Sequence, residues 1–261
     1  MGDSLVEVFA GRPHPATGDK WRLRVKKRTF DVVVICLAAV VWVPVVLMAA
    51  LAVLVLSGRP IYYRSRRWVG PGTAIEMVKL RVMVPNANKV VAPVEAGRFL
   101  NTPPDSPLYT PVGRVLDRLG LNEIPQFVHV LRGEMSIVGA RPLTDVVRDA
   151  LTDQHGDIDT RWETPAGLTG LPQLIGRHDI DDHQRLVLES AYSMRTARDA
   201  SIRLDFKILL FTVLITFGLK QPMTFESALA LAQPRPRRRR VHTPDLAQPL
   251  YGAAAPEADV A

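Results

Sequence analysis

Cysteine is almost absent from this chain of 261 residues. Cys36 is the only cysteine, so no disulfide can form within the chain and no cysteine-based metal site can be built. The six histidines show no spacing typical of metal ligands, because the one close pair, His178 and His183, is five residues apart and would not share a helix face. The sequence therefore excludes a disulfide-stabilised fold and gives no support to a zinc site.

Acidic residues are outnumbered by basic ones. The chain has 26 Asp and Glu against 33 Lys and Arg, which gives a net charge of +7 and a pI of about 9.8. Such a balance favours polyanionic partners, namely nucleic acid, acidic lipid headgroups or phosphate-bearing substrates. Nucleic acid is not expected, because the chain has neither a basic patch interleaved with aromatic residues nor a recognition motif. The arginine-rich stretch 234–240 better suits lipid headgroups.

Residues 32–56 form a run of 25 residues without a charge, which is long enough to cross a bilayer. Two features argue against simple spanning. Pro44 lies in the middle of the run and would kink a helix there. Both flanks are strongly basic, whereas a single-pass helix has its lysine and arginine on one side. From the residues alone, a re-entrant helix and a kinked spanning helix are equally supported.

The remaining chain has local patterns for short elements. Residues 58–83 predict two short strands joined by a "VGPG" turn. Residues 110–133 predict two helical pieces, the first capped by Thr110 and the second beginning at Asn122. A mixed-charge helix is expected from about 181 to 198. The second apolar stretch, 206–219, is too short to span, so it predicts a helix in the membrane interface or in the core.

These patterns predict an α+β fold that is mainly α-helical with a small β-hairpin. We expect a mobile N-terminal arm at 1–19, followed by a basic interfacial segment with the membrane helix at 20–57. A cytosolic domain is expected at 58–221 and a disordered tail rich in Arg, Pro and Ala at 222–261.

Basic residues near glycine and proline are the first candidates for chemistry. A guanidinium held by a stiff turn suits a clamp on phosphate oxygens, and the candidates are Lys79, Arg81, Arg141 and Arg177. Each of them alone is better explained as solvated surface charge. Glu123 is the best-placed carboxylate, at the expected start of a helix. Considered alone, it is better explained by helix capping, with Asn122 as N-cap and Glu123 favoured by the helix dipole.

Four motifs, taken together in their order along the chain, favour a role in chemistry for these residues over surface charge and helix capping. The stretches "GRPIYYRSRRWVGPG", "MVKLRVM", "LNEIPQFVHVLRGEMSIVGARP" and "GLTGLPQLIGR" resemble the bacterial sugar transferases, which are monotopic phosphoglycosyl transferases. The resemblance covers roughly residues 26 to 220, including Asp31 before the proline-broken apolar segment. It is closest to the small members with one re-entrant helix, so it favours a re-entrant helix kinked at Pro44 in this chain.

The resemblance implies an enzyme of the cytoplasmic face of the bacterial inner membrane. Such an enzyme transfers a sugar-1-phosphate from a UDP-sugar to polyprenyl (undecaprenyl) phosphate, releases UMP, and starts a surface glycan such as exopolysaccharide, capsule or glycoconjugate. The implied cofactor is Mg²⁺. The implied partners are the two substrates and membrane lipid, and a homodimer is compatible with the sequence.

The chain departs from the family pattern at its acid pair. The family uses an adjacent Asp-Glu pair whose Asp attacks phosphorus, but this chain has Asn122 followed by Glu123. Where the family usually has arginine, this chain has Asp117. Three interpretations remain open: Glu123 acts as nucleophile with Asp117 and Glu123 holding the metal, turnover is slow, or the chain is an inactive homologue that binds nucleotide-sugar or partners as a scaffold.

Overall fold

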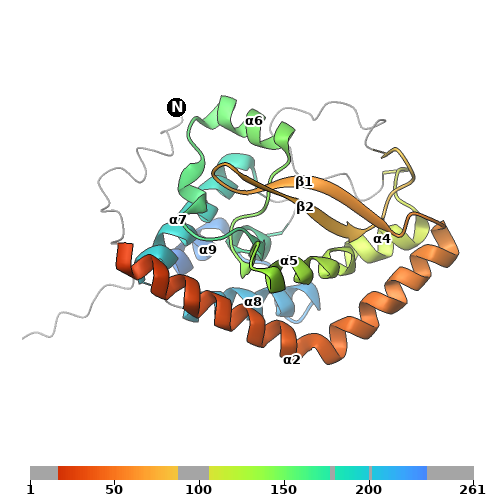
Figure 1. Ribbon diagram of the computed structural model, residues 1–261. Helices are drawn as coiled ribbons and strands as arrows, with labels where there is room; N and C mark the ends of the chain where they lie inside the picture. The colour runs from red at the N-terminus through yellow and green to blue at the C-terminus, as the bar shows by residue number, and fades with distance from the viewer. Residues whose placement is uncertain (1–16, 88–105, 177–179, 200–201, 234–261) are drawn as a thin grey trace, which may run out of the picture.

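The computed structural model describes residues 17–87, 106–176, 180–199 and 202–233 (Figure 1). Among these residues the chain is mostly helical with two small sheets, as the sequence predicts. The α-helices are α2 Thr17–Ser57, α4 Pro111–Arg118, α5 Phe127–Arg132, α6 Asp145–His155, α7 Asp182–Asp199, α8 Arg203–Thr216 and α9 Phe225–Ala232. The strands are β1 Tyr62–Gly70, β2 Thr73–Leu80, β3 Ser136–Val138 and β4 Gly167–Thr169, and the 3₁₀ helices are η1 Leu121–Gln126, η2 Asp159–Trp162 and η3 Leu171–Leu174.

Helix α2 is the one candidate membrane helix among the described residues. Within its segment Leu23–Ser57, an apolar window of 18 residues has a mean hydropathy of 2.9 and is only 11% buried, whereas a soluble core helix would be mostly buried. Pro44 lies inside the helix. In Figure 1 the ribbon of α2 runs downward and then turns upward, so its two parts point in different directions. The helix is therefore compatible with membrane association by length, composition and exposure.

A buried ion pair fastens the first part of α2 to the rest of the protein. Lys27 Nζ donates hydrogen bonds to Asp205 Oδ2 at 2.7 Å, to the Tyr192 hydroxyl at 2.9 Å and to the Val138 carbonyl at 2.9 Å. The Tyr192 hydroxyl in turn donates to Asp205 Oδ1 at 2.7 Å. Burial, and then the charge of Asp205, raise the pKa of Tyr192 well above its usual value, so the phenol stays protonated. A buried charge is stable only with such partners.

The predicted hairpin is confirmed as β1 and β2, with Pro71 and Gly72 in the turn. Gly72 has a φ of 66°, which favours glycine there. Tyr63 pairs with Lys79 and Ser65 with Met77. Because side chains alternate along a strand, this register places Ser65, Arg67, Met77 and Lys79 on one face of the hairpin.

The corner between α4 and η1 differs from the prediction in one respect. Thr110 caps α4 as expected, since its side chain accepts from the Gly113 N–H at 3.0 Å. The prediction that Asn122 caps the second helical piece is wrong, because Gly120 precedes η1 and takes the left-handed conformation at φ 69°. Asn122 instead lies inside η1 with 1% of its surface exposed.

A small parallel sheet of β3 and β4 lies next to this corner. Ser136 pairs with Gly167 and Val138 with Thr169. A β-carbon on Gly139 would lie 2.2 Å from the Pro165 carbonyl oxygen, and one on Gly167 would lie 2.0 Å from the Gly139 nitrogen. Only glycine allows the two backbones to approach so closely. The sequence predicted a short strand or loop at 135–142, but it did not predict β4.

The C-terminal part contains one clear correction. The tail was predicted to be disordered from residue 222, but Phe225–Ala232 form α9, and Ala228 and Ala232 are buried in the main core. That core also takes side chains from α2, α5, β3, α7 and α8. The predicted helix at 181–198 is confirmed as α7.

The second apolar stretch is helical as predicted. Helix α8 buries Ile208 in the core and leaves Phe206, Leu210 and Val213 exposed along one side. At the N-terminus, α2 begins at Thr17, inside the predicted arm, while 1–16 and the arginine-rich stretch 234–240 lie outside the described residues.

Candidate active site

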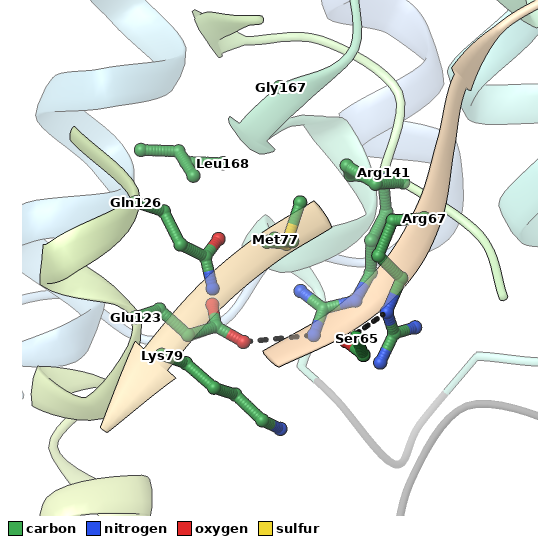
Figure 2. A pocket seen from close by; sticks show the side chains of 10 residues that line it. Ser65, Arg67, Met77, Lys79, Glu123, Gln126, Arg141, Gly167 and Leu168 are labelled. Atoms are coloured by element: carbon green, nitrogen blue, oxygen red, sulfur yellow. Dashed lines mark hydrogen bonds and ion pairs between the residues drawn. The ribbon is translucent and has the colours of Figure 1, made fainter. Parts of the chain in front are cut away.

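A pocket lies where the hairpin, η1 and the small parallel sheet meet. Its volume is about 400 Å³, which includes the solvent at its open side. Figure 2 shows its side chains converging from segments that are distant in sequence. It is lined by Ser65 and Arg67 of β1, Met77 and Lys79 of β2, Glu123 and Gln126 of η1, Arg141 and Pro142 after β3, and Gly167 and Leu168 of β4.

The structure brings three of the predicted site residues together here. Glu123 Oε1 accepts a hydrogen bond from Arg141 Nη2 at 3.0 Å, and both side chains are partly exposed to the pocket. Figure 2 shows Lys79 next to Glu123, below it in this view. The charge of Glu123 is the largest influence on Arg141 and raises its pKa further, so the guanidinium is always charged.

Arg67 also lines the pocket, although the sequence analysis did not select it. Burial lowers the pKa of Arg67 and of Lys79, and Arg141 lowers both further through repulsion. Glu123 opposes these effects on both groups. Three cations therefore surround one carboxylate, which leaves the lining with a surplus of two positive charges. A diphosphate group would balance such a surplus.

A buried ion pair holds the main chain of Arg141. The Arg141 N–H donates to Glu189 Oε1 at 3.0 Å, and Arg161 Nη2 donates to the Arg141 carbonyl oxygen at 2.8 Å. Arg161 and Glu189 are also bonded to each other, with 0% and 1% of their side chains exposed. Both peptide groups that flank the Arg141 side chain are thus fixed from behind the pocket. Sequence reasoning missed both residues, because they are 20 and 48 positions away from Arg141.

A second cluster lies on the corner between α4 and η1. Asn122 Nδ2 donates to Asp117 Oδ1 at 2.9 Å, and the Tyr109 hydroxyl donates to Asp117 Oδ2 at 3.1 Å. The charge of Asp117 also acts on Lys79 and Arg141. It opposes the lowering of the pKa of Lys79 that burial causes, and it adds to the rise in the pKa of Arg141. The structure therefore brings Asp117, Asn122 and Glu123 to one side of the pocket.

Asp117 and Glu123 are the residues that could hold Mg²⁺. Mg²⁺ is commonly bound by one or two carboxylates together with water and substrate phosphates, so two carboxylates beside an anion pocket fit this cation. In the part of the chain that the structure describes, no group of three or more His, Cys, Asp or Glu residues could bind a metal. Asp117 and Glu123 alone would supply only part of the ligands of Mg²⁺, and water and substrate phosphates would supply the others.

One predicted phosphate ligand, Arg81, does not lie in this pocket. Arg81 is 5% exposed, and its Nη2 donates to the carbonyl oxygens of Ser57 and Gly58 at 2.5 and 2.8 Å. The structure thus gives Arg81 the role of capping the end of α2 in place of the predicted phosphate contact. Arg177 lies outside the described residues.

A pocket with one carboxylate among three cationic side chains, in a protein that carries a long and exposed apolar helix, suits a membrane-associated enzyme for phosphate-bearing substrates. The chain belongs to the bacterial sugar transferase family, which matches residues 22–218. The predicted family is confirmed, and with it phosphoglycosyl transferase activity as the class of enzyme.

Three relatives show how far the similarity extends. The chain is 33% identical over 193 residues to the exopolysaccharide production protein ExoY of Sinorhizobium fredii, covering 71% of this chain and 84% of the relative. It is 31% identical over 211 residues to the UDP-glucose:undecaprenyl-phosphate glucose-1-phosphate transferase of Caulobacter vibrioides, covering 80% and 74%. It is 33% identical over 178 residues to the undecaprenyl-phosphate galactose phosphotransferase of Salmonella typhimurium, covering 65% and 36%. The names of the second and third relatives specify different sugars, glucose and galactose.

Proposed function

We propose that this chain transfers a sugar-1-phosphate from a UDP-sugar to undecaprenyl phosphate at the cytoplasmic face of the bacterial inner membrane and releases UMP. The observation that carries this proposal is the pocket in which Glu123 lies among Arg67, Lys79 and Arg141. Its surplus positive charge suits the diphosphate of a nucleotide-sugar. The product would start a surface glycan, in keeping with the names of the relatives.

The proposed reaction has two steps. A Glu123 oxygen attacks the sugar-linked phosphorus, the new O–P bond replaces the bond to UMP, and UMP leaves with the electron pair. An oxygen of undecaprenyl phosphate then attacks the same phosphorus and restores the Glu123 carboxylate. The three cations bind the phosphate oxygens and stabilise their charge in both steps. Mg²⁺ bound by Asp117 and Glu123 would supply further neutralisation of phosphate oxygens.

A second candidate function follows from Asn122. An amide neither attacks phosphorus nor carries charge, so a catalytically impaired homologue that binds nucleotide-sugar as a scaffold is the alternative.

One assay separates the two functions. The full chain in lipid nanodiscs with undecaprenyl phosphate and Mg²⁺ is incubated with UDP-glucose, UDP-galactose and their N-acetylamino counterparts, and UMP is measured. We expect UMP release from at least one donor, dependent on undecaprenyl phosphate for continued turnover. Failure of the folded protein to release UMP from any donor would reject the enzyme and leave the scaffold.

We also propose that α2 is re-entrant, entering and leaving the membrane at the cytoplasmic face. Its first part is bonded through Lys27 to α7, α8 and β3, and its last carbonyl groups are capped by Arg81, directly after β2. These partners belong to one packed body, which cannot lie on both sides of a bilayer. Pro44 and the basic flanks support the same arrangement.

Cysteine labelling tests this arrangement, because Cys36 is the only native cysteine. In a Cys36→Ser background, single cysteines replace Ser4 and the exposed Arg59, which flank the apolar segment on either side. We expect a membrane-impermeant maleimide to label neither cysteine in spheroplasts and both after permeabilisation. Labelling of one of the two in intact spheroplasts would indicate a spanning helix.

A further inference from the structure

The amide of Asn122 has only one orientation that makes a hydrogen bond. Its Nδ2 donates to Asp117 Oδ1 at 2.9 Å, while its Oδ1 is buried without a hydrogen-bond partner among the described residues. Rotating the amide by half a turn would put its oxygen against the carboxylate oxygen, and two acceptors repel. The hydrogen bond to Asp117 therefore fixes the side chain, and Asn122 acts there as a donor.

Asp117 receives a second hydrogen bond from the opposite side. The Tyr109 hydroxyl donates to Oδ2 at 3.1 Å, so each carboxylate oxygen has its own donor. Asn122 is 1% exposed, so its donor group does not swing into solvent. Two donors on a carboxylate set both its position and its plane.

We propose that Asn122 is a positioning residue that holds the Asp117 carboxylate beside the pocket, with Tyr109 as the second support. Asn122 and Asp117 then form one donor–acceptor unit, in which residue 117 supplies the carboxylate and residue 122 supplies the amide. This inference deepens the proposed function and rests on it for the catalytic consequence, whereas the pairing itself is independent of any activity.

Because Asn122 and Asp117 pair in this way, replacing Asn122 with aspartate should not simply restore the acid pair of the family. In Asn122→Asp, one new carboxylate oxygen would face Asp117 at about the 2.9 Å of the present bond, and the other would occupy the buried place where none of the described residues supplies a donor. A buried carboxylate with a like charge as neighbour and no donor is strongly disfavoured. We therefore expect Asn122→Asp to lower UMP release at least about tenfold.

The exchange variant Asp117→Asn/Asn122→Asp tests the unit directly. In it the amide at 117 donates to one oxygen of the carboxylate at 122, and the Tyr109 hydroxyl donates to the amide oxygen, so the repulsion between two carboxylates is removed. The second carboxylate oxygen at 122 still lacks a donor among the described residues. We therefore expect the melting temperature to fall by roughly 5 °C or more in Asn122→Asp and to recover in part in the exchange variant. UMP release should recover at least partly in the exchange variant.

Matched controls separate this coupling from a general effect of added charge. Gln221→Glu adds the same charge at an exposed position and should change neither melting temperature nor UMP release. Asp117→Asn alone keeps a donor and an acceptor, so it should keep the melting temperature but lose at least about tenfold in UMP release, through the lost charge.

Several results would overturn the inference. An unchanged melting temperature in Asn122→Asp, or no recovery in the exchange variant, would show that the two residues are not coupled. A gain of UMP release in Asn122→Asp alone would show that position 122 is a lost nucleophile and not a support. If the wild type releases no UMP from any donor, the proposed function fails, but the melting temperatures still decide whether the pair exists.

Discussion

Replacing Glu123 with glutamine is expected to reduce UMP release at least about a thousandfold. The glutamine keeps the size of the side chain but cannot form the acyl phosphate, because an amide is a very weak nucleophile. It also removes the anion that Arg141 binds at 3.0 Å, so the guanidinium loses its partner in the empty pocket. Initial rates over a range of UDP-sugar concentrations measure the effect, and we expect it in kcat more than in KM.

The covalent step gives this prediction a second readout. With UDP-sugar and no undecaprenyl phosphate, the wild type should gain the mass of one phosphosugar, and Glu123→Gln should not. Glu76→Gln is the matched control, since Glu76 lies on the same hairpin and its side chain is 66% exposed. If Glu123→Gln still gains the phosphosugar and Asp117→Asn does not, the nucleophile is Asp117 and the proposed role of Glu123 is wrong.

The parts of the fold that were predictable from the sequence are those that local chemistry determines. The hairpin follows from alternating residues on either side of Pro71 and Gly72, and α4 follows from Thr110 before a proline. Asn122 misled the prediction because it is a good capping residue by type, whereas Gly120 takes the left-handed conformation that ends the preceding turn. Residue type alone could not rank the two positions.

Helix α9 was missed for a different reason. Phe225–Ala232 is short, and the Pro- and Arg-rich sequence that follows it is typical of disorder. Its stability comes from Ala228 and Ala232, which pack in a core built by α2, α7 and α8. Such stabilisation depends on distant segments, so the local sequence does not report it.

The candidate site likewise has residues that could be predicted from the sequence and residues that could not. Glu123, Lys79 and Arg141 could be predicted because they lie in motifs that resemble a family, and the structure brings all three into one pocket. Arg81 is only two residues from Lys79 and on the same motif, yet its guanidinium binds the end of α2. The sequence shows that both residues are basic, but only the three-dimensional path of the chain shows what each one faces.

Replacing Arg161 with methionine is the stability change that we expect to be largest. It would leave the Glu189 carboxylate, 1% exposed, without its cation, and breaking a buried pair in this way costs about 3–5 kcal/mol. For a chain of this size, that corresponds to a fall in melting temperature of roughly 10 °C. Arg195→Met is the matched control on α7, because the partly exposed pair of Arg195 with Asp199 should contribute about 1 kcal/mol or less.

The double variant Arg161→Met/Glu189→Met separates stability from positioning. Removing both members of a buried ion pair often restores much of the stability, because the two opposite charges are removed together. Arg185, which is 7% exposed, loses the nearby charge of Glu189 in this variant, so the recovery is not complete. The Arg141 N–H and carbonyl groups would still lack their partners, so Arg141 would no longer be held toward Glu123. We therefore expect the double variant to recover much of the melting temperature but to stay at least about tenfold below the wild type in UMP release. Recovery of both properties together would mean that the ion pair only stabilises the fold, and the proposed bracing of Arg141 would then be wrong.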